Sequence, residues 1–566
     1  MKKLTLFFLF ISSVLLSINP DPNWFYKAKL GIFIHWGLYS EIGYTEWAMD
    51  HFRISPDNYG KLASVFNPDS FDADSIVDLV KESGAKYLVF TAKHHDGFCL
   101  YDSKFTSYKI TKTPFGKDVL KLIQKACQKR NIKFGIYYSV IDWHHPDYLP
   151  RRSWDNRPVT DADLNRYKSY FKNQLFELIR DYNPDIIWFD GGWEDTFSKT
   201  ETDSLTAQIH TLKPQILINN RLSNNTQGNF ITPEGKVPTT ALFDQDHKPL
   251  LWENCLTMGD CWGYNPYQNF FYSERDLIRN LCDISSKGGN LLLNISPDPK
   301  GLIPVEQSDR LLKLGKWLSK NNEAIYESDP SIFKNYSFYG RSTSKNNNIY
   351  ISLFQKNLDN RLFLPIIPNL KSVSFLNDPT LLRYKTENSR LIVSLPESLP
   401  DINASVIVIK TDQELSPISY KPIYSKTEQI TLHAFDCLPF PAENTINLTQ
   451  YYDKVLTDNW NYSNYNSKLE WEFILKDNSI YDIYIYATSR QEETGDMKMI
   501  FKTDNSQYDF ILKNLPRWTA LNKGLESPFK LENIELKTGL NHLSLSCSDL
   551  KNNQQVCFEK IILISK

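Results

Sequence analysis

The stretch Asp-Ile-Ile-Trp-Phe-Asp-Gly-Gly-Trp, residues 185–193, decides the fold of this chain. Its apolar start is typical of a buried strand, and the strand ends at the carboxylate of Asp190, before two glycines that turn the chain. Trp188 and Trp193 flank this carboxylate. Parallel barrels carry their catalytic side chains at this end of a strand. Aspartate also caps turns without a catalytic role, so the stretch alone leaves both interpretations open.

Length and composition bound the architecture and the partners. The 566 residues exceed what one hydrophobic core holds, and roughly two to four domains are expected. The formal net charge is −2, without a basic patch or a long charge run, which argues against nucleic acid and anionic membranes as partners. Aromatic residues make up 14% of the chain; they fill cores, but they also stack on sugar rings.

Residues 1–20 have the composition of a secretory signal peptide. A pair of lysines precedes an apolar core at residues 4–16 that is too short to remain as a transmembrane helix. We therefore expect an exported protein, periplasmic or extracellular, with no stable membrane span after cleavage; an uncleaved anchor is the alternative. The eight cysteines show no CxxC spacing, and Cys547 and Cys557 could pair across neighbouring strands.

Strand-like and helix-like segments alternate over residues 21–330 with the spacing of a parallel barrel. Polar and aromatic clusters follow the strands, so the active face should lie at the C-terminal strand ends. We predict an α/β fold, a (β/α)8 TIM-like barrel, with a functional loop at residues 224–261. The expected strands are residues 30–34, 87–91, 133–139, the run that ends at Asp190, 215–219 and 290–295; the expected helices are residues 75–83, 117–130, 163–181, 205–212, 274–287 and 305–321.

From about residue 331 the pattern changes to short alternating strands. Residues 331–412 predict a small antiparallel β-sandwich, and residues 427–566 predict a jelly-roll β-sandwich behind a Pro- and Ser-containing connector. Trp460, Tyr462 and Tyr465 would suit a carbohydrate-binding surface of this last domain. Such residues equally often fill a core, so a binding module and a purely structural sandwich both stay open.

A series of short motifs follows the predicted strands in order. The motifs are GIFIHWG at 31–37, EW at 46–47, KHHDGF at 93–98, FGIYYS at 134–139, WFD at 188–190, TPE at 232–234, WE at 252–253, WGYN at 262–265 and GGNLLLN at 288–294. Together they resemble the α-L-fucosidases of glycoside hydrolase family 29. The resemblance covers roughly residues 22–410, and the combination of motifs is far more specific than any one of them.

The resemblance implies an exo-acting enzyme that removes terminal α-linked L-fucose from fucosylated oligosaccharides or glycoconjugates with retention of configuration. Retention requires two carboxyl groups about 5 to 5.5 Å apart, a nucleophile and an acid/base. Asp190 matches the family's nucleophile and would form a covalent fucosyl-enzyme. Glu234 and Glu253 both match positions proposed for the acid/base, and we favour Glu234. The acid/base needs a raised pKa to hold its proton.

The same matching implies a set of substrate-binding residues. Histidines would read sugar hydroxyls, Glu46 would accept a hydroxyl proton, and Trp47 would form an apolar wall. Tyr137 and Arg221 would contact the sugar, and indoles would contact its C6 methyl group. The full set is His35, Glu46, Trp47, His94, His95, Tyr137, Trp188, Arg221 and Trp262.

Other readings of these residues remain open at this point. Three histidines could bind a metal, but the accompanying carboxylates are out of register and the family works without metal, so we expect neither metal nor cofactor. His94 and His95 could be purely structural. The barrel could also be a catalytically silent fucose- or glycan-binding protein, or a glycosidase for another sugar such as galactose.

Overall fold

The structure, a computed structural model, describes most of the chain after the predicted signal. The described residues are 22–235, 237–238, 241–243, 249–334, 340–356, 360–365, 367–387, 390–419, 423–425, 429–434, 448–451, 454–457, 460–461, 468–489, 496–513, 515, 528–549 and 555–566. The predicted signal peptide, Tyr462, Tyr465 and the side chain of Trp460 lie outside the described part.

A parallel sheet of seven strands organises the first half of the chain, in the order β5-β4-β3-β2-β1-β7-β6. Every neighbouring pair is parallel. Nearly all strand residues are buried, because side chains fill the inside of the curved sheet while helices cover its outside. The strands are β1 (Leu30–Ile34), β2 (Tyr87–Lys93), β3 (Lys133–Ser139), β4 (Ile186–Asp190), β5 (Leu217–Ile218), β6 (Glu253–Thr257) and β7 (Asn290–Ile295).

The predicted eight-stranded barrel is found only in part. Between β5 and β6 the described chain forms isolated parallel bridges instead of a strand: Asn219 with Phe230, Ile231 with Trp252, and Glu234 with Cys255. Proline at position 233 has no N–H to donate, and Gly228 and Gly235 have positive φ angles, so regular pairing is interrupted here. The predicted strand at 215–219 shrinks to two residues for the same lack of a regular partner.

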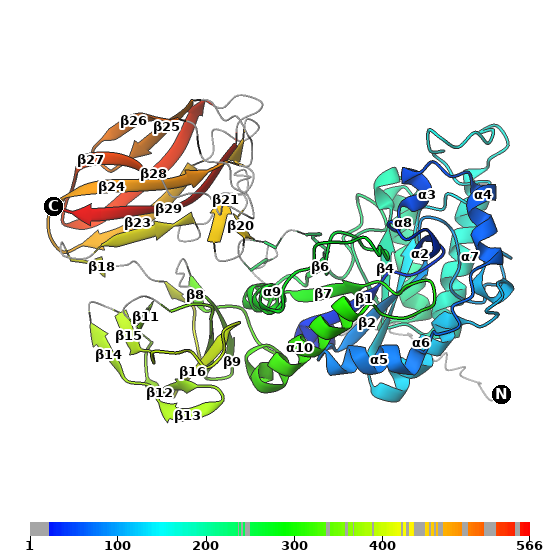
Figure 1. Ribbon diagram of the computed structural model, residues 1–566, viewed down its shortest axis with the longest axis horizontal. Helices are drawn as coiled ribbons and strands as arrows, with labels where there is room; N and C mark the ends of the chain where they lie inside the picture. Colours follow the sequence, from blue (N-terminus) through cyan, green and yellow to red (C-terminus); the bar gives the residue numbers. More distant parts are fainter. Residues whose placement is uncertain are drawn as a thin grey trace, which may run out of the picture.

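The helices begin where side chains cap their free backbone N–H groups. Asp72, Asp118 and Asp163 accept such hydrogen bonds at the starts of α5, α6 and α7. Ser198 and Glu201 form a capping box, so α8 begins well before its predicted start. The helices are α1 (Asn23–Ala28), α2 (Tyr39–Ile42), α3 (Ala48–His51), α4 (Pro56–Gly60), α5 (Ala73–Glu82), α6 (Val119–Arg130), α7 (Leu164–Tyr182), α8 (Lys199–Leu212), α9 (Glu274–Ser286) and α10 (Val305–Asn321); Figure 1 shows α5 to α10 around the outside of the sheet.

The expected change from parallel to antiparallel pairing after the α/β region is confirmed (Figure 1). The first group has sheets β13-β12-β16-β10-β9 and β11-β15-β14 and the short parallel pair β17-β8. Its strands are β8 (Phe333–Lys334), β9 (Gly340–Lys345), β10 (Asn348–Leu353), β11 (Arg361–Pro365), β12 (Leu370–Phe375), β13 (Asp378–Leu381), β14 (Tyr384–Glu387), β15 (Arg390–Ser394), β16 (Ser405–Thr411) and β17 (Ile418–Ser419).

The second group has two larger sheets, β18-β23-β28-β25-β26 and β19-β29-β24-β27, with β22 beside β29 and a separate β20-β21 pair. Burial alternates along β23, as expected for a strand with one face on a core. Its strands are β18 (Ile423–Tyr424), β19 (Ile430–His433), β20 (Leu448–Tyr451), β21 (Lys454–Thr457), β22 (Trp460–Asn461), β23 (Lys468–Leu475), β24 (Ser479–Thr488), β25 (Met497–Lys502), β26 (Gln507–Leu512), β27 (Phe529–Leu536), β28 (Gly539–Asp549) and β29 (Gln555–Ser565).

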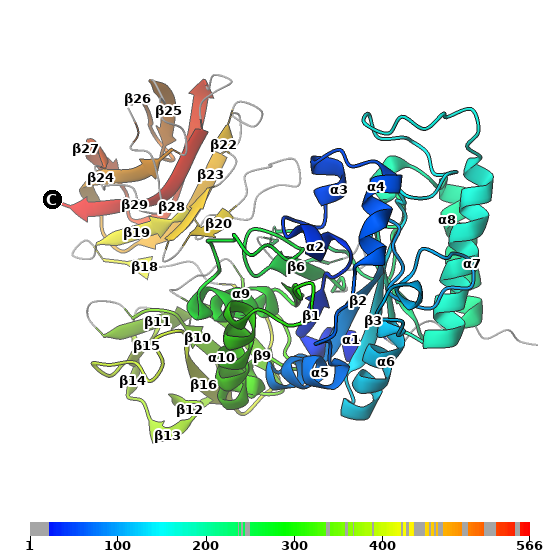
Figure 2. The same cartoon turned by 45° about the vertical axis from the view of Figure 1, so that its right-hand side comes forward.

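Each group of sheets has a hydrophobic cluster of its own, and the first group also packs on the α/β region. Arg279 of α9 donates to the carbonyl oxygens of Phe354 and Asn403, and the Trp317 indole of α10 donates to the carbonyl oxygen of Ala404. Figure 2 shows α9 and α10 between the parallel sheet and the sheets of the first group. The first group therefore shares buried contacts with the helices that carry the parallel sheet.

Two further expectations concern the cysteines and the membrane. Cys547 lies on β28 and Cys557 on β29, which belong to different sheets, so they are not on neighbouring strands as predicted. Among the helices that the structure describes, none combines the length and the hydropathy needed to cross a bilayer.

The contact between α5 and α10 gives a test of the packing. A Cβ atom at Gly315 of α10 would lie 1.9 Å from the backbone oxygen of Glu82, so the helices must move apart to accommodate it. We expect Gly315→Ala to lower the free energy of unfolding by about 1–3 kcal/mol, measured by urea unfolding. Lys316→Ala, at an exposed position of the same helix, is the control; equal stability of the two variants would contradict this packing.

Candidate active site

The predicted site residues converge on one small cavity at the C-terminal ends of the strands. Its volume is about 110 Å³. Ten of the eleven predicted residues line it, and the eleventh, His95, lies beside it with Nε2 3.7 Å from Asp190 Oδ2. The lining residues are Phe33, His35, Glu46, Trp47, His94, Tyr137, Trp188, Asp190, Trp193, Arg221, Glu234, Cys255 and Trp262.

Three lining residues were missing from the predicted set: Phe33, Trp193 and Cys255. Strand parity could have found Phe33, which lies two residues before His35 and therefore on the same side of the chain. Cys255 gave no such signal, because the strand β6 was not recognised in the sequence. Trp193 was noted only as a neighbour of the Asp190 turn.

Asp190 and Glu234 meet at one nitrogen of Arg221. The Nη1 atom of Arg221 lies 3.3 Å from Asp190 Oδ1 and 2.7 Å from Glu234 Oε2. Because both oxygens lie on the same atom, their separation cannot exceed the sum of these distances, 6.0 Å. The two carboxyl groups are therefore close neighbours, as the paired carboxyl groups of a glycosidase are.

The two carboxylates differ in exposure. The Asp190 side chain is 13% exposed, whereas that of Glu234 is 46% exposed and stands at the mouth. Burial raises the pKa of Asp190 above its ordinary value, against the opposing effects of Arg221 and of the Tyr137 hydroxyl, which donates to Oδ2 at 3.0 Å. The pair therefore consists of one enclosed and one open carboxyl group.

Arg221 is held in place by the TPE motif and by Trp188. Its Nε and Nη2 atoms donate to the side-chain and backbone oxygens of Thr232, both at 2.9 Å. The guanidinium lies over the Trp188 ring, 4.8 Å from its centroid. Because three separate contacts fix the guanidinium, it sets the positions of both carboxylates.

Glu253, the other acid/base candidate, does not line the cavity. It is fully buried and accepts hydrogen bonds from the Tyr87 hydroxyl and from Trp188 Nε1, the latter at 2.9 Å. Burial raises its pKa to about 7. In this position the carboxyl group orients the Trp188 indole from behind the cavity wall.

The histidines are neutral, and their hydrogen bonds fix the tautomers of two of them. Burial lowers the pKa of His35 and of His95 to about 3, and that of His94 well below its usual range. His35 Nδ1 lies 2.8 Å from Asn294 Oδ1, an acceptor, so Nδ1 carries the proton. His35 Nε2 is therefore left as an acceptor.

The tautomer of His95 is fixed by a chain of two hydrogen bonds through the Ser139 hydroxyl. The Ser139 hydroxyl donates to the carbonyl oxygen of Ile141 and so must accept from His95 Nδ1 at 2.6 Å. His95 Nε2, which faces Asp190, is then unprotonated. His94 stacks on Tyr137, and its buried Nδ1 has no hydrogen-bond partner among the described residues.

The loops after β1 and β6 close the far side of the cavity. Glu46 accepts hydrogen bonds from the Thr45 hydroxyl at 2.6 Å and from the backbone N–H of Gly263 at 2.9 Å, both at Oε2. Asn294 Nδ2 donates to the carbonyl oxygen of Trp262 at 2.7 Å. Glu46 therefore joins two loops that are far apart in sequence and keeps Oε1 available for another donor.

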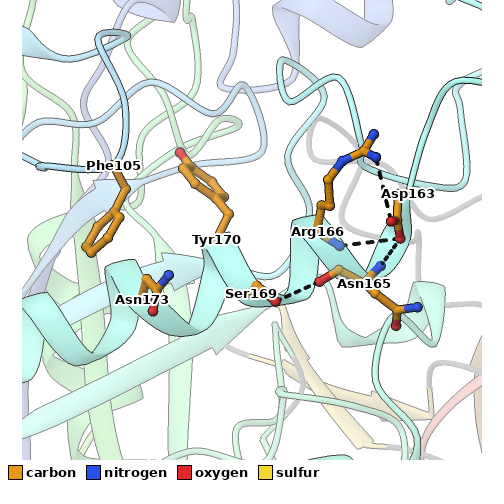
Figure 3. A pocket seen from close by; sticks show the side chains of 7 residues that line it. All are labelled: Phe105, Asp163, Asn165, Arg166, Ser169, Tyr170 and Asn173. Atoms are coloured by element: carbon orange, nitrogen blue, oxygen red, sulfur yellow. Dashed lines mark hydrogen bonds and ion pairs between the residues drawn. The ribbon is translucent and has the colours of Figure 1, made fainter.

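A second, more open hollow lies against α7 (Figure 3). Its polar groups have structural partners: Asp163 caps the helix, and Arg166 pairs with Asp147 and Asp163. It holds no facing pair of carboxyl groups, so the chemistry points to the smaller cavity. Within the described ranges, no group of three or more His, Cys, Asp and Glu side chains is arranged to hold a metal ion.

Comparison with known proteins matches this arrangement of residues to one family. A family model described as Alpha-L-fucosidase matches residues 14–323. The chain belongs to the α-L-fucosidase family, glycoside hydrolase family 29. The expected family and enzyme class are thereby confirmed.

Relatives extend the match beyond the α/β region. The chain is 30% identical over 438 residues to an α-L-fucosidase of Dictyostelium discoideum, covering 71% of this chain and 92% of that one. It is 33% identical over 421 residues to tissue α-L-fucosidase of Homo sapiens, covering 68% and 87%. These fucosidases are glycoside hydrolases, and so is this chain.

Solved structures give the same family. An α-L-fucosidase of Vibrio sp. strain EJY3 superposes with a TM-score of 0.77 and 25% identity over 96% of this chain and 97% of that one. The α-L-fucosidase isoenzyme 1 of Paenibacillus thiaminolyticus superposes with a TM-score of 0.67 and 34% identity, covering 69% of this chain and 99% of that one. A Bacteroides thetaiotaomicron α-L-fucosidase, described as a trapped covalent intermediate, superposes with a TM-score of 0.63 and 27% identity, covering 70% of this chain and 97% of that one.

The position of Glu253 predicts a pH effect on stability. The pKa of Glu253 in the folded protein, about 7, exceeds its ordinary value of 4.5, so the folded protein holds an extra proton between these pH values and loses stability as pH rises through them. The loss is on the order of 3 kcal/mol. We expect Glu253→Gln to remove this pH-dependent loss. In urea unfolding between pH 4.5 and 7.5, the free energy of unfolding of the variant should therefore rise relative to that of the wild type as the pH increases. Parallel pH curves would contradict the buried carboxyl.

Proposed function

We propose that the protein is an exo-acting, retaining α-L-fucosidase in which Asp190 is the nucleophile and Glu234 the acid/base. The observation that carries the proposal is the shared hydrogen bonding of both carboxylates to Arg221 Nη1, which keeps one oxygen of Asp190 and one of Glu234 no more than 6.0 Å apart. This separation agrees with the spacing of about 5 to 5.5 Å in retaining enzymes. Burial gives Glu253 the raised pKa that was expected of the acid/base, but Glu253 lies outside the cavity, so we assign it as a positioning residue and choose Glu234 on its position.

The two environments suit the two roles. Asp190 lines the cavity in a largely enclosed position. Arg221 and the Tyr137 hydroxyl stabilise its carboxylate form, which the nucleophile needs. An Asp190 oxygen bonds to the anomeric carbon while the glycosidic bond breaks, and the leaving oxygen takes the proton of Glu234. Water then gives a proton to Glu234 and attacks the same carbon, which releases fucose and the Asp190 carboxylate.

The cavity's polar groups support recognition of one terminal sugar. His35 Nε2 and Glu46 Oε1 are acceptors for sugar hydroxyls. The Trp188 and Trp262 rings supply apolar surface for the C6 methyl group. The small volume admits a chain end rather than an internal residue, so fucosylated oligosaccharides or glycoconjugates are the proposed substrates.

The same proposal includes the wider architecture. Residues 230–234 occupy the place of the eighth strand, and their bridges to both neighbours support a closed barrel over residues 21–330. Residues 331–412 and 427–566 form a small sandwich and a jelly roll, supported by two groups of antiparallel sheets with separate cores. Residues 1–20 direct export to the periplasm or the cell exterior.

Removal of the nucleophile should stop turnover. We expect Asp190→Gly to lower kcat/KM for an aryl α-L-fucoside by several orders of magnitude with the fold intact, because the first covalent step is lost. Added azide should enter from the vacated side and give the β-fucosyl azide, identified by NMR. Asp203→Ala, an exposed carboxylate on α8, is the control. Wild-type rates in Asp190→Gly would disprove the assignment.

Removal of the acid/base should instead depend on the leaving group. We expect Glu234→Ala to retain most of its kcat/KM for a dinitrophenyl fucoside, whose leaving group needs no proton, and to lose at least about a hundredfold for a fucosyl disaccharide. Azide should now attack the fucosyl-enzyme and give the α-fucosyl azide. Glu253→Gln should show neither effect; if it does and Glu234→Ala does not, the two roles must be exchanged.

A further inference from the structure

We propose that Trp193 is the stacking platform for the leaving-group sugar, a pyranose ring linked to the fucose that occupies the cavity. This inference rests on the proposed function and extends it to specificity outside the fucose site. Trp193 lines the mouth of the cavity. Its side chain is 46% exposed, whereas every other tryptophan side chain that the structure describes is buried or half-buried.

The turn that carries Trp193 is fixed from both sides. A Cβ atom at Gly192 would lie 2.4 Å from the backbone oxygen of Arg221, so the turn packs directly against the chain after β5. The neighbouring Glu194 accepts from the Tyr148 hydroxyl and pairs with Arg152 at 3.3 Å. An exposed indole on so constrained a backbone is preorganised for binding, because little conformational freedom is lost when a ligand stacks on it.

Trp193 lines the same cavity as Asp190 and Glu234. Its ring meets the edge of His95 at 87°, with centroids 5.8 Å apart, and His95 Nε2 is 3.7 Å from Asp190 Oδ2. Glu234, which protonates the leaving oxygen, opens toward solvent at the same mouth. A sugar attached to that oxygen extends out through this mouth, where the flat apolar surface of the exposed indole suits the C–H face of a pyranose.

Arg152 supports the turn next to Trp193. Its guanidinium lies 5.3 Å from the Trp47 ring centroid and 5.1 Å from that of Trp143, and it pairs with Asp50 at 3.4 Å as well as with Glu194. Arg152 thus links the turn that carries Trp193, through Glu194, to Trp47 in the wall of the cavity.

The test compares leaving groups with and without a ring. We expect Trp193→Ala to lower kcat/KM for an α-L-fucosyl-galactose disaccharide about tenfold or more, and to change kcat/KM for α-L-fucosyl fluoride less than about twofold, because fluoride has nothing to stack. Trp193→Phe should recover most of the loss. Phe105→Ala is the matched control, because Phe105 is 44% exposed and lines the separate hollow of Figure 3.

Two results would overturn the platform. If Trp193→Ala lowers kcat/KM equally for the disaccharide and the fluoride, Trp193 supports the fucose site instead. If kcat/KM for the disaccharide is unchanged, no stacking occurs. Failure of the proposed function looks different, because the wild-type protein would then hydrolyse neither substrate. Undiminished fluoride hydrolysis by Trp193→Ala also shows that this variant is folded.

Discussion

The guanidinium of Arg221 is the contact on which the site depends. It brings Asp190, at the end of β4, and Glu234, in the irregular segment before β6, to a single nitrogen atom. Two carboxylates placed this close would repel each other in a cavity of low polarity, and the cation between them offsets that repulsion. One ion-pair geometry therefore sets how closely the two carboxylates approach each other.

Enclosure of the cavity gives its polar groups their chemical states. Burial makes the three histidines neutral, and it raises the pKa of Asp190 while Arg221 and Tyr137 oppose the shift. Neutral imidazoles can accept as well as donate, so they can distinguish hydroxyl positions on a sugar. The same exclusion of water strengthens every charge interaction at the reacting carbon.

A second layer of polar side chains keeps the lining residues in position. Asn294 and Ser139 set the tautomers of His35 and His95, and Glu253 holds the Trp188 indole, which in turn lies under Arg221. None of these supporting groups reaches the cavity itself. A site that must keep its geometry to a fraction of an ångström needs such support, because lining side chains alone are free to change rotamer.

The sequence by itself determined most of the site and most of the strand and helix pattern, apart from β6 and the helices α1 to α4. The residues before and after each strand end are read directly from the chain, so Asp190, the histidines and Tyr137 could be placed at one edge of the sheet in advance. The helix periodicities also gave nearly correct bounds, apart from α8, where a capping box outweighed the apolar pattern.

Only the tertiary structure decided which glutamate faces the cavity and how the sheet is completed. Glu234 and Glu253 lie in similar sequence surroundings, but Glu234 contacts Arg221 and Glu253 contacts Trp188. Both partners come from other parts of the chain, so the burial of each glutamate depends on long-range packing. The irregular bridges of residues 230–234 and the exposure of Trp193 likewise follow from long-range packing. Local sequence patterns carry no information on such contacts, because they form between segments that are distant in the chain.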